Sequence, residues 1–594
     1  MSQIVVLNAG GQYCHLIARR IRELGVHATV ADIDAPAAAL VTARGIIISG
    51  GPASVVEPTS PSVDPGIYEL GVPILGICYG HQLLARDLAG RVEPGVTKEY
   101  GHSALHAGDG VLFSAVPTRE LRVWMSHGDT VVDIPPGFSI VGETDDCKVA
   151  AMEDRTRRLF GLQFHPEVVH TDHGLEILRT FVADVCRCVA DWDPRARLAQ
   201  VMETIRTTAA DRNVFFLISG GVDSTVAFYL CARALGPDRV LGLYVDTGFM
   251  RDSDADAMHY LERAVGRKAI QVADRSADFF AALEGVSNPE RKRAIIGDVF
   301  VDVQEDEFAK LGLHARDWLL GQGTIYPDTI ESGGARHAAK IKTHHNRAPR
   351  IQALIDAGRV IEPLVEFYKD EVRVLGDQLG LPHDVVWRHP FPGPGLAVRC
   401  VCADAGASVH ATSIALPAGV RGFIVPVRTV GVQGDERSYS NLLAIEGAGG
   451  VEAAGTLARR VTNEHRTINR VVDVVHRRAG RPLDALSIQP ATLTRERVAL
   501  LREADARVTR VVRAHGIYDT IWQFPVGMLP LGAEPGRETI VLRPVSSRDG
   551  MTAEYARLPE PVVRDIAQAL ATLDRVDAVV YDVTNKPPAT IELE

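Results

Sequence analysis

The sequence has few cysteines and no long apolar run, and both shortages exclude classes of protein. Eight cysteines in 594 residues are too few for the disulfide framework of a small secreted domain. The closest pairs, Cys186 with Cys188 and Cys400 with Cys402, lack the two-residue spacing of a zinc knuckle, which favours incidental buried thiols. No apolar stretch is long enough to cross a bilayer, and the first residues show no signal-peptide pattern. We therefore expect a cytoplasmic protein with no membrane partner.

Positive charge is not in excess either. The chain has 64 Lys and Arg against 75 Asp and Glu, a net charge of −11, which argues against a nucleic-acid partner. A hydrophobic content of 46% and a charged content of 23% are ordinary for a globular protein. The length exceeds what one hydrophobic core supports, so we expect three to four domains whose partners are small molecules.

Alternating apolar runs and helical stretches predict the fold class. The pattern indicates two α/β domains, each a doubly wound and mostly parallel sheet, followed by α+β C-terminal subdomains. The expected strands of the two α/β domains are Ile4–Leu7, Gly45–Ser49, Pro73–Ile77, Arg158–Phe164, Val214–Ile218, Val240–Val245 and Trp318–Leu320. A linker is expected at Asp191–Pro194. The predicted domains are 1–190, 195–402, 403–490 and 491–594.

The last two predicted subdomains resemble each other, which suggests a degenerate duplication. Phe423–Val430 and Pro525–Leu531 are both apolar strands with a proline, and each precedes a second strand and a helix. Asn469–Val472 then parallels Arg575–Val580. A chance match of strand patterns is the alternative interpretation.

A thiol stands in a glycine-flanked turn between a predicted strand and a predicted helix. In Gly76–Gly80 the glycines permit a tight turn that presents Cys78 as a nucleophile, with helix N–H groups to favour a thiolate. His165-Pro166-Glu167 follows another predicted strand, so His165 can deprotonate Cys78 and Glu167 can orient His165. Gly50 and Gly51 are suited to supply a further oxyanion N–H group.

The second glycine loop follows Val214–Ile218 and has no Walker lysine. Hydroxyl groups, glycine N–H groups and a helix N-terminus there suit a pyrophosphate, and Asp223 can hold Mg²⁺ against it. The alternative is a polar turn in which Asp223 or Ser224 caps the helix. The expected phosphate-binding residues are Ser219, Gly220, Gly221, Val222, Asp223, Ser224 and Thr225.

The thiol segments resemble the class I glutamine amidotransferases. The resemblance rests on Cys78–Gln82, Gly50-Gly51-Pro52 and His165-Pro166-Glu167. It implies a Cys78–His165–Glu167 triad that hydrolyses glutamine through a glutamyl thioester. His81 departs from the common methionine. His127, His170 and His173 are competing histidines, and the acid after the proline favours His165. The implied oxyanion and glutamine-binding residues are Gly51, Tyr79, Gln82, His127 and Asp129.

The phosphate loop resembles that of N-type ATP pyrophosphatases, and the resemblance extends to the whole chain. Gly242–Arg251, Gly321–Glu331, Arg388–Arg399 and Lys586–Glu592 are together similar to the glutamine-hydrolysing GMP synthetases. That family implies adenylation of xanthylate by ATP and displacement of AMP by ammonia. It implies Mg²⁺ with ATP as cofactor. The further implied ATP-binding residues are Val245 and Lys342, and the implied xanthylate-binding residues are Arg293, Asp435, Gln523, Lys586 and Glu592.

Two alternatives and one question of assembly remain. Another adenylating amidotransferase, such as an NAD synthetase-like enzyme, would share both loops, and a non-catalytic regulator would not need an intact triad. Shorter GMP synthetases, by the resemblance, carry a Gly-Asp turn and a Lys-Pro-Pro tail in one domain and dimerise through it. Here Asp435 lies in the first copy and Lys586 in the second. We therefore expect an in-chain pseudo-dimer of the longer, eukaryotic-like type, a monomer or weak homodimer.

Overall fold

The chain folds as two units, and each contains distant segments of the sequence. The structure is a computed structural model that describes residues 2–11, 13–266, 269–312, 316–332, 354–404, 412–417, 419–433, 436–465, 467–479, 485–547 and 553–594. The first unit comprises 1–198, 324–353 and 365–371, and the second comprises 199–323, 354–364 and 372–594. Among the described residues, no helix is long and apolar enough to cross a membrane.

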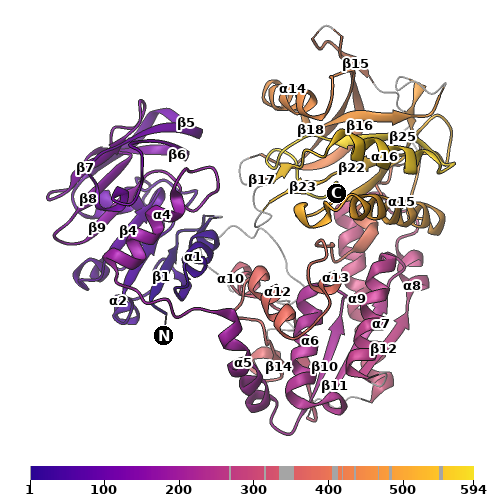
Figure 1. The fold of residues 1–594 in the computed structure, drawn as a ribbon, viewed down its shortest axis with the longest axis horizontal. Coiled ribbons are helices and arrows are strands. Elements are labelled where there is room, and N and C mark those ends of the chain that lie inside the picture. Colours follow the sequence, from indigo (N-terminus) through magenta and orange to yellow (C-terminus); the bar gives the residue numbers. More distant parts are fainter. Residues whose placement is uncertain are drawn as a thin grey trace. The chain divides into compact units, whose positions relative to one another are not determined.

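The first unit is built on a nine-stranded sheet in the order β2-β1-β3-β4-β9-β8-β7-β5-β6 (Figure 1). The first five strands in that order are parallel, and the rest pair antiparallel. The parallel strands are β1 (Ile4–Asn8), β2 (Ala28–Asp32), β3 (Gly45–Ile48), β4 (Ile74–Ile77) and β9 (Leu159–Leu162). The antiparallel strands are β5 (Arg91–Ala107), β6 (Glu120–Asp133), β7 (Ser139–Glu143) and β8 (Ala151–Asp154).

Alternating side chains along the parallel strands fill two cores, one on each face of this sheet. On one face Ile47 and Leu75 pack with α1 (Cys14–Glu23), α4 (Gly174–Arg179) and the π-helical turn that continues α4. On the other face their neighbours Ile46 and Ile74 pack with α2 (Ala37–Leu40) and α3 (Tyr79–Asp87). Because β3, β4 and β9 pair parallel to one another, their carboxyl ends lie at one edge of the sheet.

The expected linker is docked onto the first unit. Trp192 is 5% exposed, and its backbone N–H donates to the Gly25 carbonyl. The Arg22 guanidinium lies 4.3 Å from the centre of the Trp192 ring, and it also lies over the rings of Tyr326 and Tyr368. A cation enclosed by aromatic rings is a favourable contact. Residues 324–332 and 365–371 are therefore fixed to α1.

The second unit begins with a five-stranded parallel sheet in the order β12-β11-β10-β13-β14. Its strands are β10 (Asn213–Ile218), β11 (Val240–Asp246), β12 (Ile270–Asp274), β13 (Trp318–Gly321) and β14 (Val360–Ile361). Its helices are α6 (Val222–Leu235), α7 (Asp252–Val265), α8 (Ser276–Ala282), α9 (Pro289–Leu311) and α13 (His383–Val386). In the sequence, α5 (Pro194–Ala209) and α12 (Lys369–Gln378) each cross a division between the two units, and α10 (Tyr326–Ser332) belongs to the first unit. The strand order reverses between β10 and β13, where ligands of such sheets bind.

The C-terminal part of the second unit is a seven-stranded sheet in the order β15-β16-β17-β18-β25-β22-β20 (Figure 1). One half is β16 (Arg421–Gln433), β17 (Glu436–Glu446), α14 (Val451–Glu464) and β18 (Ile468–Arg477), with β15 (Thr412–Ile414) at the edge. The other half is β20 (Val526–Leu529), β22 (Glu538–Leu542), α16 (Glu560–Ala571) and β25 (Val576–Asp582). The helix α15 (Arg495–Ala514) packs on α16. Two short pairs, β19 (Ser487–Ile488) with β21 (Leu531–Gly532) and β23 (Val545–Ser546) with β24 (Glu554–Tyr555), complete it.

The two halves have the same topology. In each, an antiparallel strand pair is followed by a helix and by a strand parallel to the second of the pair. The last strands of the halves, β18 and β25, pair antiparallel with each other. The strand order is therefore symmetric about the β18–β25 pair. The strand β22 ends before Arg543-Pro544, because proline has no N–H group to donate to a neighbouring strand.

Candidate functional site

The strained residue of the thiol turn is the cysteine. Cys78 lies between β4 and α3 with φ 52° and ψ −103°, a conformation that costs on the order of 1–3 kcal/mol. Neither flanking glycine has a positive φ. A Cβ on Gly76 would lie 2.3 Å from the Gly80 carbonyl oxygen, and one on Gly80 would lie 2.2 Å from that of Ile48. The glycines therefore allow close packing of strand and helix, which fixes the turn that presents Cys78.

His165 and Glu167 form a buried pair beside this turn. His165 Nδ1 lies 2.7 Å from Glu167 Oε1, and the two residues are 3% and 0% exposed. Burial alone would lower the pKa of His165, but the charges of Glu167 and Cys78 outweigh it and raise the pKa to about 10. A Cβ on Gly50 would contact both His165 Cε1, at 2.9 Å, and Cys78 Cβ, at 3.5 Å. The site thus holds a nucleophile, a base and an orienting acid in one small space.

The competing histidines are engaged elsewhere. His127 pairs with Glu99, and its other ring nitrogen contacts the Asp129 carbonyl. His170 stacks at a tilt on Trp124, 4.8 Å between ring centres. His173 precedes α4 in a left-handed conformation and is more than a third exposed at its side chain. Of the four candidates, His165 is the one that the structure brings to Cys78.

The expected glutamine-binding residues lie around the same turn. The Cys78 thiol donates to the Ser126 carbonyl at 3.4 Å, which brings the Ser126–Asp129 segment of β6 to the nucleophile. Gln82 Nε2 donates to the Asp129 carbonyl at 2.8 Å. The Tyr79 hydroxyl donates away from the thiol, to the Pro61 carbonyl, so Tyr79 offers its backbone N–H at the start of α3.

Gly51 lies in the loop after β3, pressed against the end of β1. A Cβ there would lie 2.4 Å from the Ala9 carbonyl oxygen. Two residues that the sequence did not single out contact the His165–Glu167 pair. Arg20 of α1 donates through Nε to the Glu167 carbonyl at 2.9 Å. The ring of Tyr13, the N-cap residue of α1, lies 5.1 Å from that of His165, edge to face. Both belong to the start of the chain, far from the motif, and only the periodic apolar pattern of α1 could have indicated them.

The phosphate loop connects β10 to α6 at the reversal of strand order. Gly220 has φ 73°, a conformation that favours glycine. The Ser219 hydroxyl accepts the Gly221 N–H at 3.2 Å and contacts the Ser224 hydroxyl at 3.2 Å. Gly221 is the N-cap residue of α6, with no side-chain cap, so the alternative of Asp223 or Ser224 as cap is wrong. Hydroxyl groups, N–H groups and a helix N-terminus therefore face one space, which suits a pyrophosphate.

The neighbouring segments converge on this loop. A Cβ on Gly323, just after β13, would lie 2.7 Å from the Ser224 nitrogen, so the two loops touch. Val222 and Thr225 are buried in the first turn of α6, and Val245 is buried near the end of β11. Asp223 adds a carboxylate, a hard oxygen ligand of the kind that Mg²⁺ prefers. Lys342 lies outside the described residues.

Three of the expected xanthylate-binding residues gather at the chain's C-terminus. Gln523 Nε2 donates to Glu592 Oε1 at 3.1 Å, and Arg293 donates to the backbone carbonyl of Glu594. The sequence did not predict that Arg399 would bind Glu592 with two hydrogen bonds of 2.9 Å each. Arg399 is 1% exposed. The feature of the sequence that could have indicated its role is its place at the end of the Arg388–Arg399 segment.

The tail that precedes Glu592 lies against the first half of the C-terminal sheet. Thr590 Oγ1 donates to the Val430 carbonyl at 3.0 Å, and Ala589 bridges Gly431. Arg470 of β18 donates to the Thr590 and Glu592 carbonyls at 3.1 and 3.0 Å. Lys586 pairs through its backbone with Ala553. Asp435 lies outside the described residues.

Comparisons with known proteins match both sites and the whole chain. Three family models match: glutamine amidotransferase class-I over residues 5–185, NAD synthase over 195–292 and GMP synthase C terminal domain over 510–593. A probable GMP synthase [glutamine-hydrolyzing] of Leptospira interrogans is 41% identical over all of this chain and 99% of its own. A GMP synthase [glutamine-hydrolyzing] of Enterococcus faecalis is 36% identical over all of this chain and 98% of its own. The solved structure of a putative GMP synthase subunit from Thermoplasma acidophilum covers 32% of this chain and 94% of its own, with 30% identity and a TM-score of 0.29.

Proposed function

The chain belongs to the family of glutamine-hydrolysing GMP synthases, and from that membership we propose how its two sites divide the reaction. The enzyme is a ligase that makes GMP from xanthylate, ATP and glutamine. An NAD synthetase-like activity would share the amidotransferase and pyrophosphatase segments. The match of residues 510–593 to the GMP synthase C terminal domain favours xanthylate as the acceptor.

The first site releases ammonia from glutamine. The Cys78 thiol gives its proton to His165 as its sulfur bonds to the side-chain carbonyl carbon of glutamine, and His165 passes that proton to the departing ammonia. The N–H groups of Gly51 and Tyr79 stabilise the oxyanion. Water then attacks the glutamyl thioester, His165 takes a proton from that water, and the thiol leaves with glutamate as product. Glu167 holds the imidazole in the tautomer that faces Cys78.

The second site activates xanthylate. The xanthylate O2 attacks the α-phosphorus of ATP, and pyrophosphate leaves into the loop of Ser219–Thr225. Ammonia then attacks the adenylated carbon, and AMP leaves with the oxygen. Asp223 would hold the Mg²⁺ that accompanies ATP, and the ion would neutralise phosphate charge there. Val245 and Lys342 complete the proposed ATP site.

Xanthylate is proposed to bind where Arg293, Gln523 and Glu592 gather at the C-terminus, with Lys586 supplied by the tail that precedes Glu592. The contacts of Lys586–Glu592 support this proposal. Through Thr590 and Arg470 they join the second half of the C-terminal sheet to the first. The symmetric strand order supports a duplication, so Asp435 of the first half and Lys586 of the second would complete one site in one chain. A cytoplasmic monomer, or weak homodimer, with the four predicted domains follows from this proposal.

The observation that carries the proposal is the buried Cys78–His165–Glu167 arrangement in one unit and the phosphate loop in the other. Cys78→Ala is expected to abolish GMP synthesis from glutamine and to preserve synthesis from ammonium. Both rates are measured with xanthylate and ATP at saturation. Equal loss with both nitrogen sources would contradict the separation of roles.

A further inference from the structure

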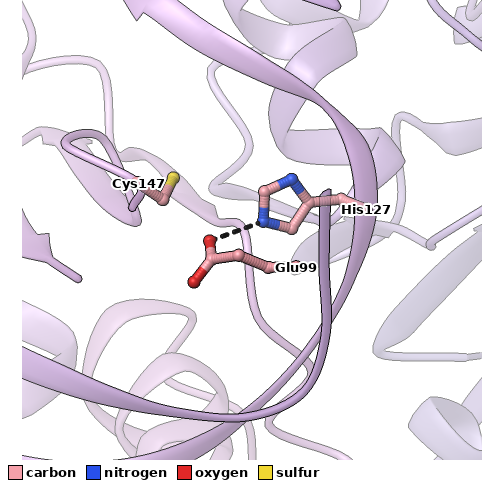
Figure 2. Close-up of side chains that lie close together, drawn as sticks. All are labelled: Glu99, His127 and Cys147. Carbon is pink, nitrogen blue, oxygen red and sulfur yellow. Dashed lines mark hydrogen bonds and ion pairs between the residues drawn. The ribbon is translucent and has the colours of Figure 1, made fainter. Parts of the chain in front are cut away.

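A buried polar cluster behind the thiol turn has no part in the proposed triad. It consists of Glu99 on β5, His127 on β6 and Cys147 in the turn after β7, which are 7%, 6% and 1% exposed (Figure 2). Their nitrogen, oxygen and sulfur atoms lie within 4.8 Å of one another. His127 directly follows Ser126, whose carbonyl accepts the Cys78 thiol. The cluster is therefore one residue away in the sequence from Ser126, which contacts the Cys78 thiol.

The hydrogen bonds of His127 determine where its protons are. Nδ1 lies 2.9 Å from the Asp129 carbonyl oxygen, which can only accept, so Nδ1 carries a hydrogen. Nε2 lies 3.1 Å from Glu99 Oε2 (Figure 2). A lone pair on Nε2 would face a carboxylate oxygen and repel it. The contact therefore needs a proton between Nε2 and Glu99.

The surroundings of Glu99 favour its ionised form. Oε1 accepts the Ser103 hydroxyl at 3.0 Å and the Thr144 hydroxyl at 3.2 Å. Burial alone would raise the pKa of Glu99, but the hydrogen bonds from His127, Ser103 and Thr144 hold it below its ordinary value. Glu99 is therefore held as a carboxylate, and it contacts the His127 ring through Nε2.

A metal ion fits these positions less well than a proton. An N···O separation of 3.1 Å is a hydrogen bond, and an ion between the atoms would have to displace it. Burial raises the pKa of the Cys147 thiol to about 11, and that thiol contacts the Thr130 hydroxyl at 3.6 Å. The thiol is therefore protonated and hydrogen-bonded, whereas a metal needs a thiolate.

The other groups that face His127 carry no positive charge. His81 of α3 is fully buried, and burial and the charge of His127 lower its pKa to about 3. The Asp129 carboxylate is bonded to the Ser54 hydroxyl. Glu99 is thus the charged side chain that contacts the His127 ring.

We propose that Glu99 is a positioning residue for glutamine hydrolysis, acting through His127. Its carboxylate holds Nε2 and so fixes the ring of His127, whose Nδ1 binds the Asp129 carbonyl while Gln82 binds the same oxygen from α3. The Ser126–Asp129 segment is thereby fixed where it meets Cys78. This inference rests on the proposed function, because it assigns that segment to the glutamine site.

The test is Glu99→Gln, which keeps the shape and removes the charge, with Cys147→Ala as the matched control inside the same cluster. Glutamine hydrolysis is measured between pH 6 and 9, and ammonium-dependent GMP synthesis in parallel reports folding of the rest of the chain. We expect E99Q to raise the KM for glutamine about tenfold to a hundredfold, the range of a charge-assisted hydrogen bond. The kcat for glutamine should change far less than the KM, because the Cys78–His165–Glu167 arrangement is left intact.

The controls separate positioning from packing. C147A should change the KM for glutamine less than about threefold and leave its pH dependence unchanged. If E99Q folds poorly, Glu99→Asp takes its place, and it should raise the KM with little change in kcat, because the charge remains but no longer reaches His127 Nε2. A wild-type KM in E99Q, an equal effect in C147A, or one bound metal per chain that C147A releases would each overturn the inference. A wild-type enzyme without glutaminase activity would instead overturn the proposed function.

Discussion

Replacing Glu167 with glutamine tests the proposed glutaminase chemistry at its most buried contact. Glu167 is fully buried and lies 2.7 Å from His165 Nδ1, so glutamine keeps the volume and removes the charge. The amide can also present its NH₂ to Nδ1, which selects the tautomer that cannot accept a proton from Cys78. The variant therefore removes both the charge and the orientation that Glu167 supplies.

The size of the effect follows from the pKa of His165. Its value of about 10 lies above the ordinary 6.5, a difference worth ~5 kcal/mol at about 1.4 kcal/mol for each pKa unit. Glu167 and Cys78 both contribute to it. If Glu167 supplies most of the gain, E167Q should lower the kcat of glutamine hydrolysis by about 10³-fold. Ammonium-dependent GMP synthesis should stay within about twofold of wild type.

The same shift gives a signed prediction for stability. Because the folded pKa of His165 is raised, its proton stabilises the first unit fully below about pH 6.5, and this contribution is lost as the pH rises towards 10. Thermal melts of E167Q should therefore fall less steeply than those of wild type across this range. A kcat within tenfold of wild type, with a wild-type pH dependence of the melt, would refute the reasoning.

Three further predictions concern the second unit. Gly221 has an ordinary φ of −66°, so the Gly221→Val variant should fold, while the valine side chain occupies the phosphate space. Pyrophosphate release should fall at least about 100-fold. Normal release would show that the loop is misassigned. Arg399→Met should raise the KM for xanthylate more than about tenfold, because it leaves the part-buried Glu592 carboxylate without its bidentate partner. An unchanged KM would separate Glu592 from the site. Asp435→Ala and Lys586→Ala should each weaken xanthylate binding measured by calorimetry, and mixing the two should restore nothing, whereas recovery on mixing would show sites completed between chains.

The sequence predicted those parts of the site that depend on local patterns. Cys78 and His165 each follow an apolar strand, and parallel strands bring their carboxyl ends to one edge, so short motifs were enough to pair them. The phosphate loop was predictable for the same reason. The β5–β8 strands were not predicted, because their antiparallel pairing depends on long and partly polar sequences.

What the sequence could not give are partners that meet only through the fold. Glu99 and His127 are 28 residues apart, and Arg399 and Glu592 are 193 residues apart. No spacing rule links such residues, since the intervening sheet order decides the contact. Arg20 likewise reaches Glu167 across the sheet from α1. Gly76 and Gly80 were predicted to allow the tight conformation of the thiol turn. In the structure they instead allow the strand and the helix to pack closely.

The central claim is that one chain couples glutamine hydrolysis to the adenylation of xanthylate. The most direct measurement is the stoichiometry of products when purified protein is given xanthylate, ATP and glutamine. We expect GMP, AMP, pyrophosphate and glutamate in equal amounts, with ammonium replacing glutamine when Cys78 is changed to alanine. Release of ADP and phosphate in place of AMP and pyrophosphate, or glutamate formation with no GMP, would contradict the account.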